Sequence, residues 1–80
     1  MAPADFRNLT QRRPFVPFRI ITSDGAAYEV RHPELVMTGL ASVLFGYPSE
    51  QDPHSYERYD IVSLRHIVRL EPEQEAVAGA

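Results

Sequence analysis

No cysteine occurs among the 80 residues of the chain, which excludes disulfide bonds and thiolate zinc sites. Lysine is absent as well, since all eight basic residues are arginine. Without lysine, neither Schiff-base catalysis nor the phosphate-binding GxxxxGK loop is possible. The four glycines are scattered at positions 25, 39, 46 and 79, so the chain has no glycine-rich phosphate loop.

Long apolar runs are missing too. No stretch approaches the roughly 18 residues that a membrane-spanning helix needs. The first nine residues, MAPADFRNL, lack the charged start and the apolar segment of a signal peptide. We therefore expect a cytoplasmic protein that does not act at a membrane.

The residues that are present suffice for one small globular domain. The chain is 44% hydrophobic, which is too much for a disordered protein but allows only a modest core. The net charge is −3, and four of the eleven acidic residues lie in the terminal segments. Residues 6–70 therefore hold seven acids against eight arginines, a net charge of +1. A nonspecific nucleic-acid binder usually shows a larger basic excess.

The N-terminal segment predicts a short helix over residues 4–13. Phe6, Leu9 and Arg13 recur at three- and four-residue spacing, which places them on one side of a helix. Pro14 then ends the helix, because proline cannot donate a backbone hydrogen bond and holds its predecessor extended.

Short apolar and alternating segments predict five strands. The second follows an Asp24-Gly25 pair, a strong signal for a hairpin turn because glycine adopts positive φ at little cost. A tight 3₁₀-type turn over residues 63–66 is expected to precede the last strand. Alternation in the first strand, FRIIT, places Phe18, Ile20 and Thr22 on one face. The other predicted strands are AYEVRH continuing after a bend as ELVM, SVLFG, YDIVSL and HIVRLEP.

The stretch RHPEL, residues 31–35, combines a histidine and a glutamate with a proline. Strict alternation places His32 on the face of Tyr28 and Val30, the face that we expect to be buried. Pro33 ends ordinary strand pairing, and Glu34 is free to pair with an arginine or to cap backbone groups. We interpret the stretch as a structural bend rather than a catalytic site.

These elements predict a mainly β fold. A strongly bent five-stranded sheet of this size is expected to close into a small SH3-like or Sm-like barrel with a short N-terminal helix. The alternative is a flatter, bent antiparallel sheet with the helix packed on one face. We expect a single domain over residues 1–72, with a long loop at 46–59 and a flexible acidic tail at 73–80.

Catalytic motifs are not apparent. No two of the three histidines are two or four residues apart, so no local pair forms a ready metal site. None of the five serines lies in a GxSxG motif, and Ser63 is three residues from His66, a spacing typical of a turn. We predict a protein without enzymatic activity or cofactor. A weak metal or ligand site requires the fold to bring His32 and His66 together.

Arginine and aromatic side chains are the best candidates for an interaction surface. Exposed tyrosines would act as stacking platforms for unpaired RNA bases, and the arginines would bind the same RNA. In the alternative interpretation Phe15 and Phe45 belong to the core, and the arginines pair with acids. Those acids are Glu29, Glu34, Glu57 and Asp60. The candidate residues are Arg12, Arg13, Phe15, Arg19, Arg65, Arg69, Tyr47 and Tyr56.

The order of the motifs in residues 12–72 resembles that of an uncharacterised group of small bacterial proteins. The shared features are a PF-x-PF-R start, a DG turn, an HPE bend and a closing SL-x-HI-x-x-LEP segment. The resemblance implies a small bacterial cytoplasmic protein. It implies no activity and therefore supplies no catalytic residues.

Two functional hypotheses follow. The first is a non-catalytic module that binds a protein partner or forms a homo-oligomer. It would associate through a strand edge or through an apolar face around PFVPF, because exposed edges of a small sheet must be covered or used. The second is an Sm-like RNA-binding barrel. Neither implies a small-molecule substrate.

Overall fold

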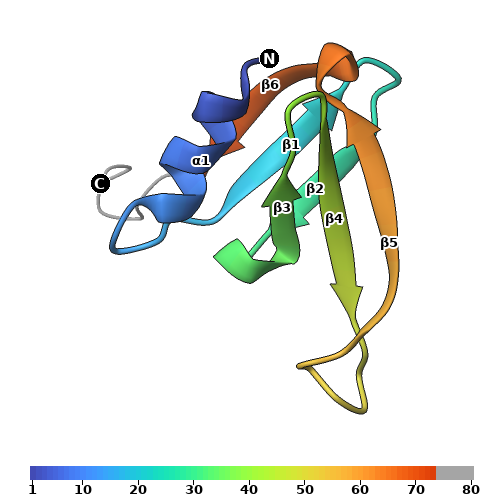
Figure 1. Ribbon diagram of the computed structural model, residues 1–80. Helices are drawn as coiled ribbons and strands as arrows, with labels where there is room; N and C mark the ends of the chain where they lie inside the picture. The colour runs from blue at the N-terminus through green and yellow to red at the C-terminus, as the bar shows by residue number, and fades with distance from the viewer. Residues whose placement is uncertain (74–80) are drawn as a thin grey trace.

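Residues 1–73 are described by the computed structural model, which contains six strands, one α-helix and two 3₁₀ turns (Figure 1). The strands form two antiparallel sheets, ordered β2-β1-β6 and β3-β4-β5. Except for Glu73, the tail predicted at 73–80 lies outside the described residues. The elements are α1 Pro3–Gln11, β1 Phe18–Thr22, β2 Ala27–Val30, η1 Pro33–Leu35, β3 Val36–Thr38, β4 Ser42–Pro48, β5 Tyr56–Ser63, η2 Leu64–His66 and β6 Ile67–Pro72.

The predicted hairpin between β1 and β2 is confirmed. Gly25 has a φ of 89°, which an L side chain rarely adopts. Its N–H donates to the Thr22 carbonyl over 3.0 Å. The Asp24 carboxylate accepts hydrogen bonds from the Thr22 hydroxyl and the Ala26 N–H, and these bonds lower the pKa of Asp24. Local side-chain chemistry therefore forms this turn.

The HPE bend is also confirmed, but the position predicted for His32 is wrong. Pro33 opens η1, and the Leu35 N–H donates to the His32 carbonyl over 3.1 Å. Leu35 is buried, whereas His32 is exposed. Val30 is the last buried residue of β2, because the chain turns away from the core at the proline.

The bend divides the predicted second strand into two. β2 pairs with β1 in one sheet, and β3 pairs with β4 in the other. The structure thus has six strands rather than five, and the mainly β prediction is confirmed. β5 pairs only with β4, and β6 pairs only with β1, so the strands of residues 1–73 do not form a closed barrel.

Two predicted boundaries need correction. The loop expected at 46–59 covers only residues 49–55, because β4 continues to Pro48 and β5 begins at Tyr56. Cross-strand pairs such as Gly46 with Tyr59 extend this ladder, and the exposed position of β5 explains its polar, loop-like composition. The helix ends at Gln11 rather than at Arg13.

The core lies between the inner faces of the two sheets, and α1 covers one end of it (Figure 1). The alternation predicted for β1 is confirmed, since Phe18, Ile20 and Thr22 are buried. Phe6 is the only buried residue of α1. Each large apolar side chain buried in this way stabilises the fold by roughly 1.5–3 kcal/mol. The core consists of Phe6, Phe18, Ile20, Val30, Val43, Phe45, Val62, Leu64 and Ile67.

The predicted 3₁₀ turn before the last strand is present as η2. The Ser63 hydroxyl accepts a hydrogen bond from the Arg65 N–H over 3.3 Å. The His66 carbonyl accepts one from the Ser23 N–H over 2.7 Å. The turn therefore carries the chain from one sheet to the other. None of the helices formed by residues 1–73 has the length and apolar character needed to cross a membrane.

Candidate interaction surface

Sheet β3-β4-β5 has an outer face that is mostly apolar. Val43 and Val62 are buried in the core, so the neighbouring positions of β4 and β5 point outward. There Met37, Leu44 and Ile61 stand opposite one another in a row across the three strands. The side chains of Met37 and Ile61 are 69% and 73% exposed. Most antiparallel sheets present polar residues at such positions.

A second row on the same face contains Gly46 and Tyr59, which pair across β4 and β5. Tyr59 is 60% exposed. The ring of Tyr56 lies over Gly46, because a Cβ atom at Gly46 would approach the Tyr56 Cδ1 atom to 2.8 Å. The Tyr56 hydroxyl donates to the Glu34 carbonyl over 2.8 Å. This bond holds the ring in place against η1.

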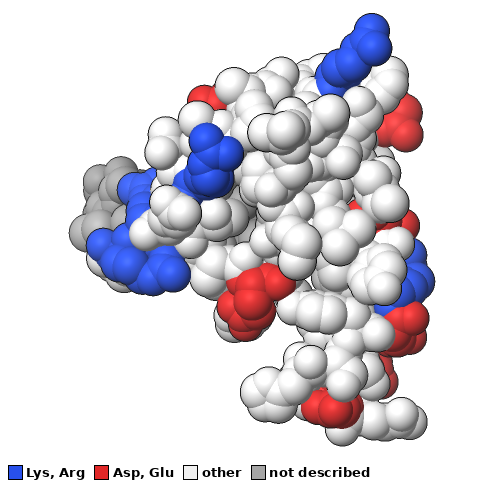
Figure 2. Space-filling model, viewed as in Figure 1, with Lys and Arg blue, Asp and Glu red and all other residues white. Residues whose placement is uncertain are grey.

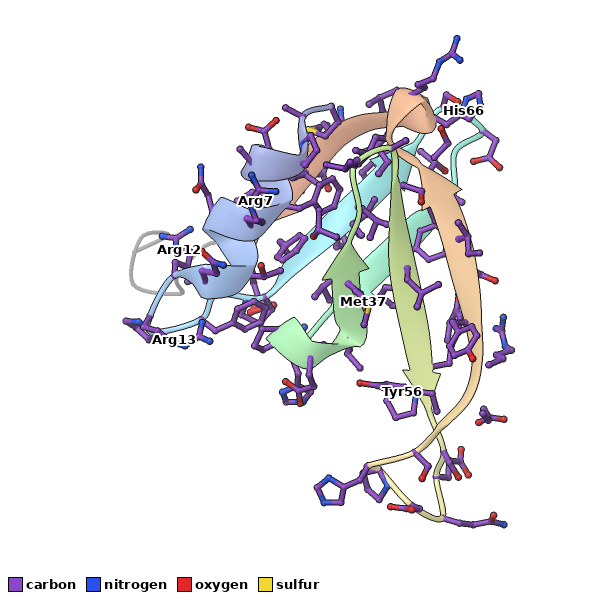
Figure 3. The ribbon with its side chains drawn as sticks, in the orientation of Figure 1. Arg7, Arg12, Arg13, Met37, Tyr56 and His66 are labelled. Atoms are coloured by element: carbon purple, nitrogen blue, oxygen red, sulfur yellow. The ribbon has the colours of Figure 1, made fainter. Side chains whose placement is uncertain are left out.

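We call the set Met37, Leu44, Tyr56, Tyr59 and Ile61 the apolar surface. Figure 2 shows few charged side chains over β3 and β4. Figure 3 labels Met37 on β3 and Tyr56, the first residue of β5, beside the end of β4. Contiguous exposed apolar groups of this kind mark binding surfaces in soluble proteins.

Beside the apolar surface, β5 forms an edge with alternating charge. The Arg58 guanidinium lies 3.7 Å from the centre of the Tyr47 ring, and its Nη1 atom is 3.6 Å from an oxygen of Asp60. The Tyr47 hydroxyl donates to Asp60 over 2.8 Å. Burial and then this hydrogen bond raise the pKa of Tyr47. Tyr47 is half-buried and packs edge-on against Phe45 at 5.0 Å, so it is not a free stacking platform.

The eight candidate residues do not converge on one site. Arg19 and Arg69 both bind Glu71, over 2.8 and 2.6 Å, on the outer face of the other sheet. The hydrogen bond from Arg19 is the largest cause of the lowered pKa of Glu71. Arg65 lies in η2, and Phe15 packs against the core. Arg19 and Arg69 thus pair with an acid, as the alternative interpretation expected, but their partner is Glu71 rather than one of the four acids predicted.

The structure instead places Arg12 and Arg13 just after the end of α1, with Arg7 on the middle of the same helix (Figure 3). All three side chains are exposed. The Arg13 Nη1 atom donates to the carbonyls of Thr10 and Arg12 over 2.9 and 2.8 Å. Within residues 1–73, no carboxylate forms an ion pair with these arginines. They form a small basic patch.

The two histidines of the metal hypothesis, His32 and His66, lie beside opposite ends of β1. Thr22 pairs with Ile67, the neighbour of His66, whereas Phe18 pairs with Val30, two residues before His32. Four residue steps of extended chain separate them by roughly 13 Å. In the part of the chain that the structure describes, no group of three or more histidine, aspartate or glutamate residues is arranged to hold a metal ion.

An open hollow of about 420 Å³ brings Asp24, Ser63 and His66 to one rim. The Asp24 carboxylate is occupied by the Thr22 hydroxyl and the Ala26 N–H. The Ser63 hydroxyl accepts the Arg65 N–H. No hydrogen bond joins Ser63 to His66 among residues 1–73, so these groups do not form the relay of a nucleophile and its base.

Met37, Leu44 and Ile61 were not among the candidate residues predicted from the sequence. The signal for Ile61 was its position next to Val62 in YDIVSL, because neighbours in a strand point to opposite faces. Assigning the residues up to Tyr59 to a loop hid the register that places Tyr59 and Ile61 on one face. The bend at Pro33 likewise hid the register of β3, and with it the outward position of Met37.

Comparison of the chain with protein-family models, with curated proteins and with solved structures found no significant match. The resemblance to small bacterial proteins therefore stays a prediction from the sequence motifs. The geometry of the described residues is the basis for the function proposed below.

Proposed function

We propose that the protein is a non-catalytic interaction module that associates through the apolar surface and the adjoining edge of β5. One observation carries the proposal: two large side chains of β5, Tyr59 and Ile61, are more than half exposed on a sheet face that is usually polar. Burying them against a protein would remove apolar area from water. The bacterial, cytoplasmic origin implied by the sequence motifs is compatible with this role.

We also propose that the two sheets are parts of one partly open, SH3-like barrel. β2 and β3 belong to one segment that η1 interrupts. The spatial order of the strands is therefore β6, β1 and β2 in one sheet, joined through η1 to β3, β4 and β5 in the other. The η2 turn links the two outermost strands. This order supports the barrel proposal, and it leaves the edges of β5 and β6 available to partners.

The experiment is light scattering during size-exclusion chromatography over a range of protein concentrations. The double substitution Tyr59→Ser with Ile61→Ser is expected to abolish association, because it removes the two most exposed apolar side chains of β5. Val68→Ser is the matched control, since Val68 is 58% exposed but lies on β6. Retention of the wild-type molar mass by the double variant would refute the proposed surface. Circular dichroism checks that each variant is folded.

RNA binding is the second candidate, and the exposed basic patch of Arg7, Arg12 and Arg13 is the observation that favours it. Absorbance at 260 and 280 nm in the same experiment, on protein purified without nuclease, detects bound nucleic acid. Under this hypothesis Arg12→Ala with Arg13→Ala weakens RNA binding and reduces its dependence on salt. Absence of RNA binding at low salt would eliminate the candidate.

A further inference from the structure

Among residues 1–73, the longest unpaired strand edge belongs to β5, and the inference drawn from it rests on the proposed function. β5 spans eight residues and pairs with β4 on one side only. Such an edge presents a row of backbone donors and acceptors that natural proteins cover, blunt or use for pairing. A second copy of the same chain offers the same edge, and a two-fold axis would bring the two edges together antiparallel.

Geometry restricts how two β5 strands can pair. A two-fold axis perpendicular to the sheet keeps every side chain on its own face, so opposed residues must point the same way. The two-fold axis must therefore lie where one residue pairs with the same residue of the second copy. The irregularity opposite Tyr47 and Pro48 leaves Glu57 as an extra residue, so regular pairing is available only from Arg58 to Ser63.

Charge selects among the remaining central residues. With Arg58 at the axis, two guanidinium groups face each other, and with Asp60 at the axis two carboxylates do; like charges directly opposite destabilise a sheet. With Ile61 at the axis, Asp60 faces a valine. Only Tyr59 at the axis places Arg58 opposite Asp60 of the second copy, and the symmetry forms this opposite-charge pair twice.

The same register also suits the apolar side chains. Tyr59 meets its symmetry mate on the outer face, and Ile61 stands diagonally beside the tyrosine of the second copy, within reach of an aromatic ring. Both side chains are more than half exposed in the single chain. Arg58 and Asp60 lie on the opposite face, where their side chains are 61% and 36% exposed. Both charged side chains therefore remain accessible to the strand of a second copy.

We propose that two copies of this chain pair antiparallel along β5, with Tyr59 on the two-fold axis and Arg58 opposite Asp60 of the second copy. The two β3-β4-β5 sheets then form one six-stranded sheet with a continuous apolar surface. The bulge at Glu57 keeps the paired segment short. A dimer held by so short a segment dissociates on dilution. Shifting the register by one residue pair in either direction would place two Arg58 or two Asp60 side chains opposite each other.

Charge reversal tests this register. Arg58→Glu places two acids opposite each other and Asp60→Arg places two arginines opposite each other, so each variant alone is expected to be monomeric by light scattering at a concentration where the wild type is a dimer. A mixture of the two variants restores opposite charges at both positions. We expect the mixture to form a heterodimer, which native mass spectrometry distinguishes from the homodimers.

Loss of the Arg58 contact with Tyr47 is the structural risk of these variants. Circular dichroism checks each fold, and the double variant Arg58→Glu with Asp60→Arg retains an ion pair within its own strand. The double variant is expected to dimerise with itself but not with the wild type, because mixed pairing opposes like charges at both positions. This result does not depend on whether either single variant folds.

Several outcomes would overturn the proposal. They are a monomeric wild type at every concentration, single variants that remain dimeric, a mixture that stays monomeric, a double variant that pairs with the wild type, or an assembly larger than a dimer. The proposed function fails separately, if the double substitution of Tyr59 and Ile61 leaves association intact. Association that requires Tyr59 and Ile61 but tolerates charge reversal would retain the surface and refute the register.

Discussion

The two sheets bury similar inner faces but present very different outer faces. On β2-β1-β6, four of the five ion pairs found within residues 1–73 lie on the outer face. Its outward positions carry Arg19, Glu29, Arg69 and Glu71 beside Ile21 and Ala27. On β3-β4-β5, the outward positions of the central rows carry Met37, Leu44, Ile61 and Tyr59. The first face is typical of a solvated sheet, and the second is typical of a binding surface.

The ion pairs on the outer face of β2-β1-β6 contribute little to the stability of the fold. Glu71 joins Arg19 and Arg69, and Arg31 joins Glu29 and Glu73. Exposed pairs of this kind add a median of about 0–1 kcal/mol. Their main effect is to keep the face hydrated and to discourage association. The apolar surface lacks this protection, which supports a role in binding.

The largest expected effect compares an inner with an outer isoleucine. Ile20 is fully buried between the sheets, whereas Ile61 is 73% exposed. Ile20→Ala is expected to lower the free energy of unfolding by about 2–5 kcal/mol. Ile61→Ala is expected to change it by less than about 0.5 kcal/mol. Urea unfolding of monomeric protein measures both, and equal losses would contradict the assigned faces.

An intermediate effect is expected where the apolar surface touches the backbone. Gly46→Ala adds a Cβ atom that would lie 2.8 Å from Tyr56, and overpacking of this kind costs about 1–3 kcal/mol. Tyr56→Ala removes the obstacle together with the hydrogen bond to Glu34. We therefore expect the double variant to be more stable than the sum of the two losses predicts. Strict additivity in thermal unfolding would show that the ring does not lie over Gly46.

A smaller effect on stability is expected when a charged residue is placed on the outer face of β3-β4-β5, as on the outer face of β2-β1-β6. Ile61→Lys should change the free energy of unfolding by less than about 0.5 kcal/mol, because the side chain is exposed. Fluorescence of a hydrophobic dye should fall, since the lysine interrupts the apolar surface. Val68→Lys on β6 is the control and should leave the fluorescence unchanged. Equal losses for both variants would mean that the dye does not report on this surface.

The smallest effect concerns the charged face and depends on pH. Arg19 and then Arg69 hold the pKa of Glu71 below its ordinary value of 4.5. A carboxylate with a lowered pKa stabilises the fold above its unfolded pKa, and this contribution is lost as the pH falls through the folded pKa. Glu71→Gln should therefore be less stable than the wild type at neutral pH. The difference should shrink between about pH 6 and about pH 3, as measured by thermal unfolding; a widening gap would reverse the assigned sign.

Much of the local structure was predictable from short segments. The Asp24-Gly25 turn, the helix stop before Pro14, the bend at Pro33 and the 3₁₀ turn at 63–66 depend on neighbours in the chain. Alternation likewise placed Phe18, Ile20 and Thr22 on the buried face. In each case the physical cause, a fixed φ, a missing donor or a two-residue period, lies within a few residues.

The candidate surface was less predictable, because it depends on partners far apart in the sequence. Arg19 and Arg69 were candidates for binding but share Glu71, more than fifty positions from Arg19. The polar residues from Tyr56 to Tyr59 have the composition of a loop, yet pairing with β4 makes them a strand. Only that pairing aligns Ile61 with Leu44 and Met37.

The sequence by itself determined the class of the fold, the positions of its turns and the absence of cysteine and lysine chemistry, because these follow from residue types and local backbone preferences. The tertiary structure decided that β2 and β3 join different sheets, that one outer face is charged and the other apolar, and that β5 has a free edge. The physical reason is that alternation assigns residues to faces within a strand, whereas long-range register decides which faces and edges meet.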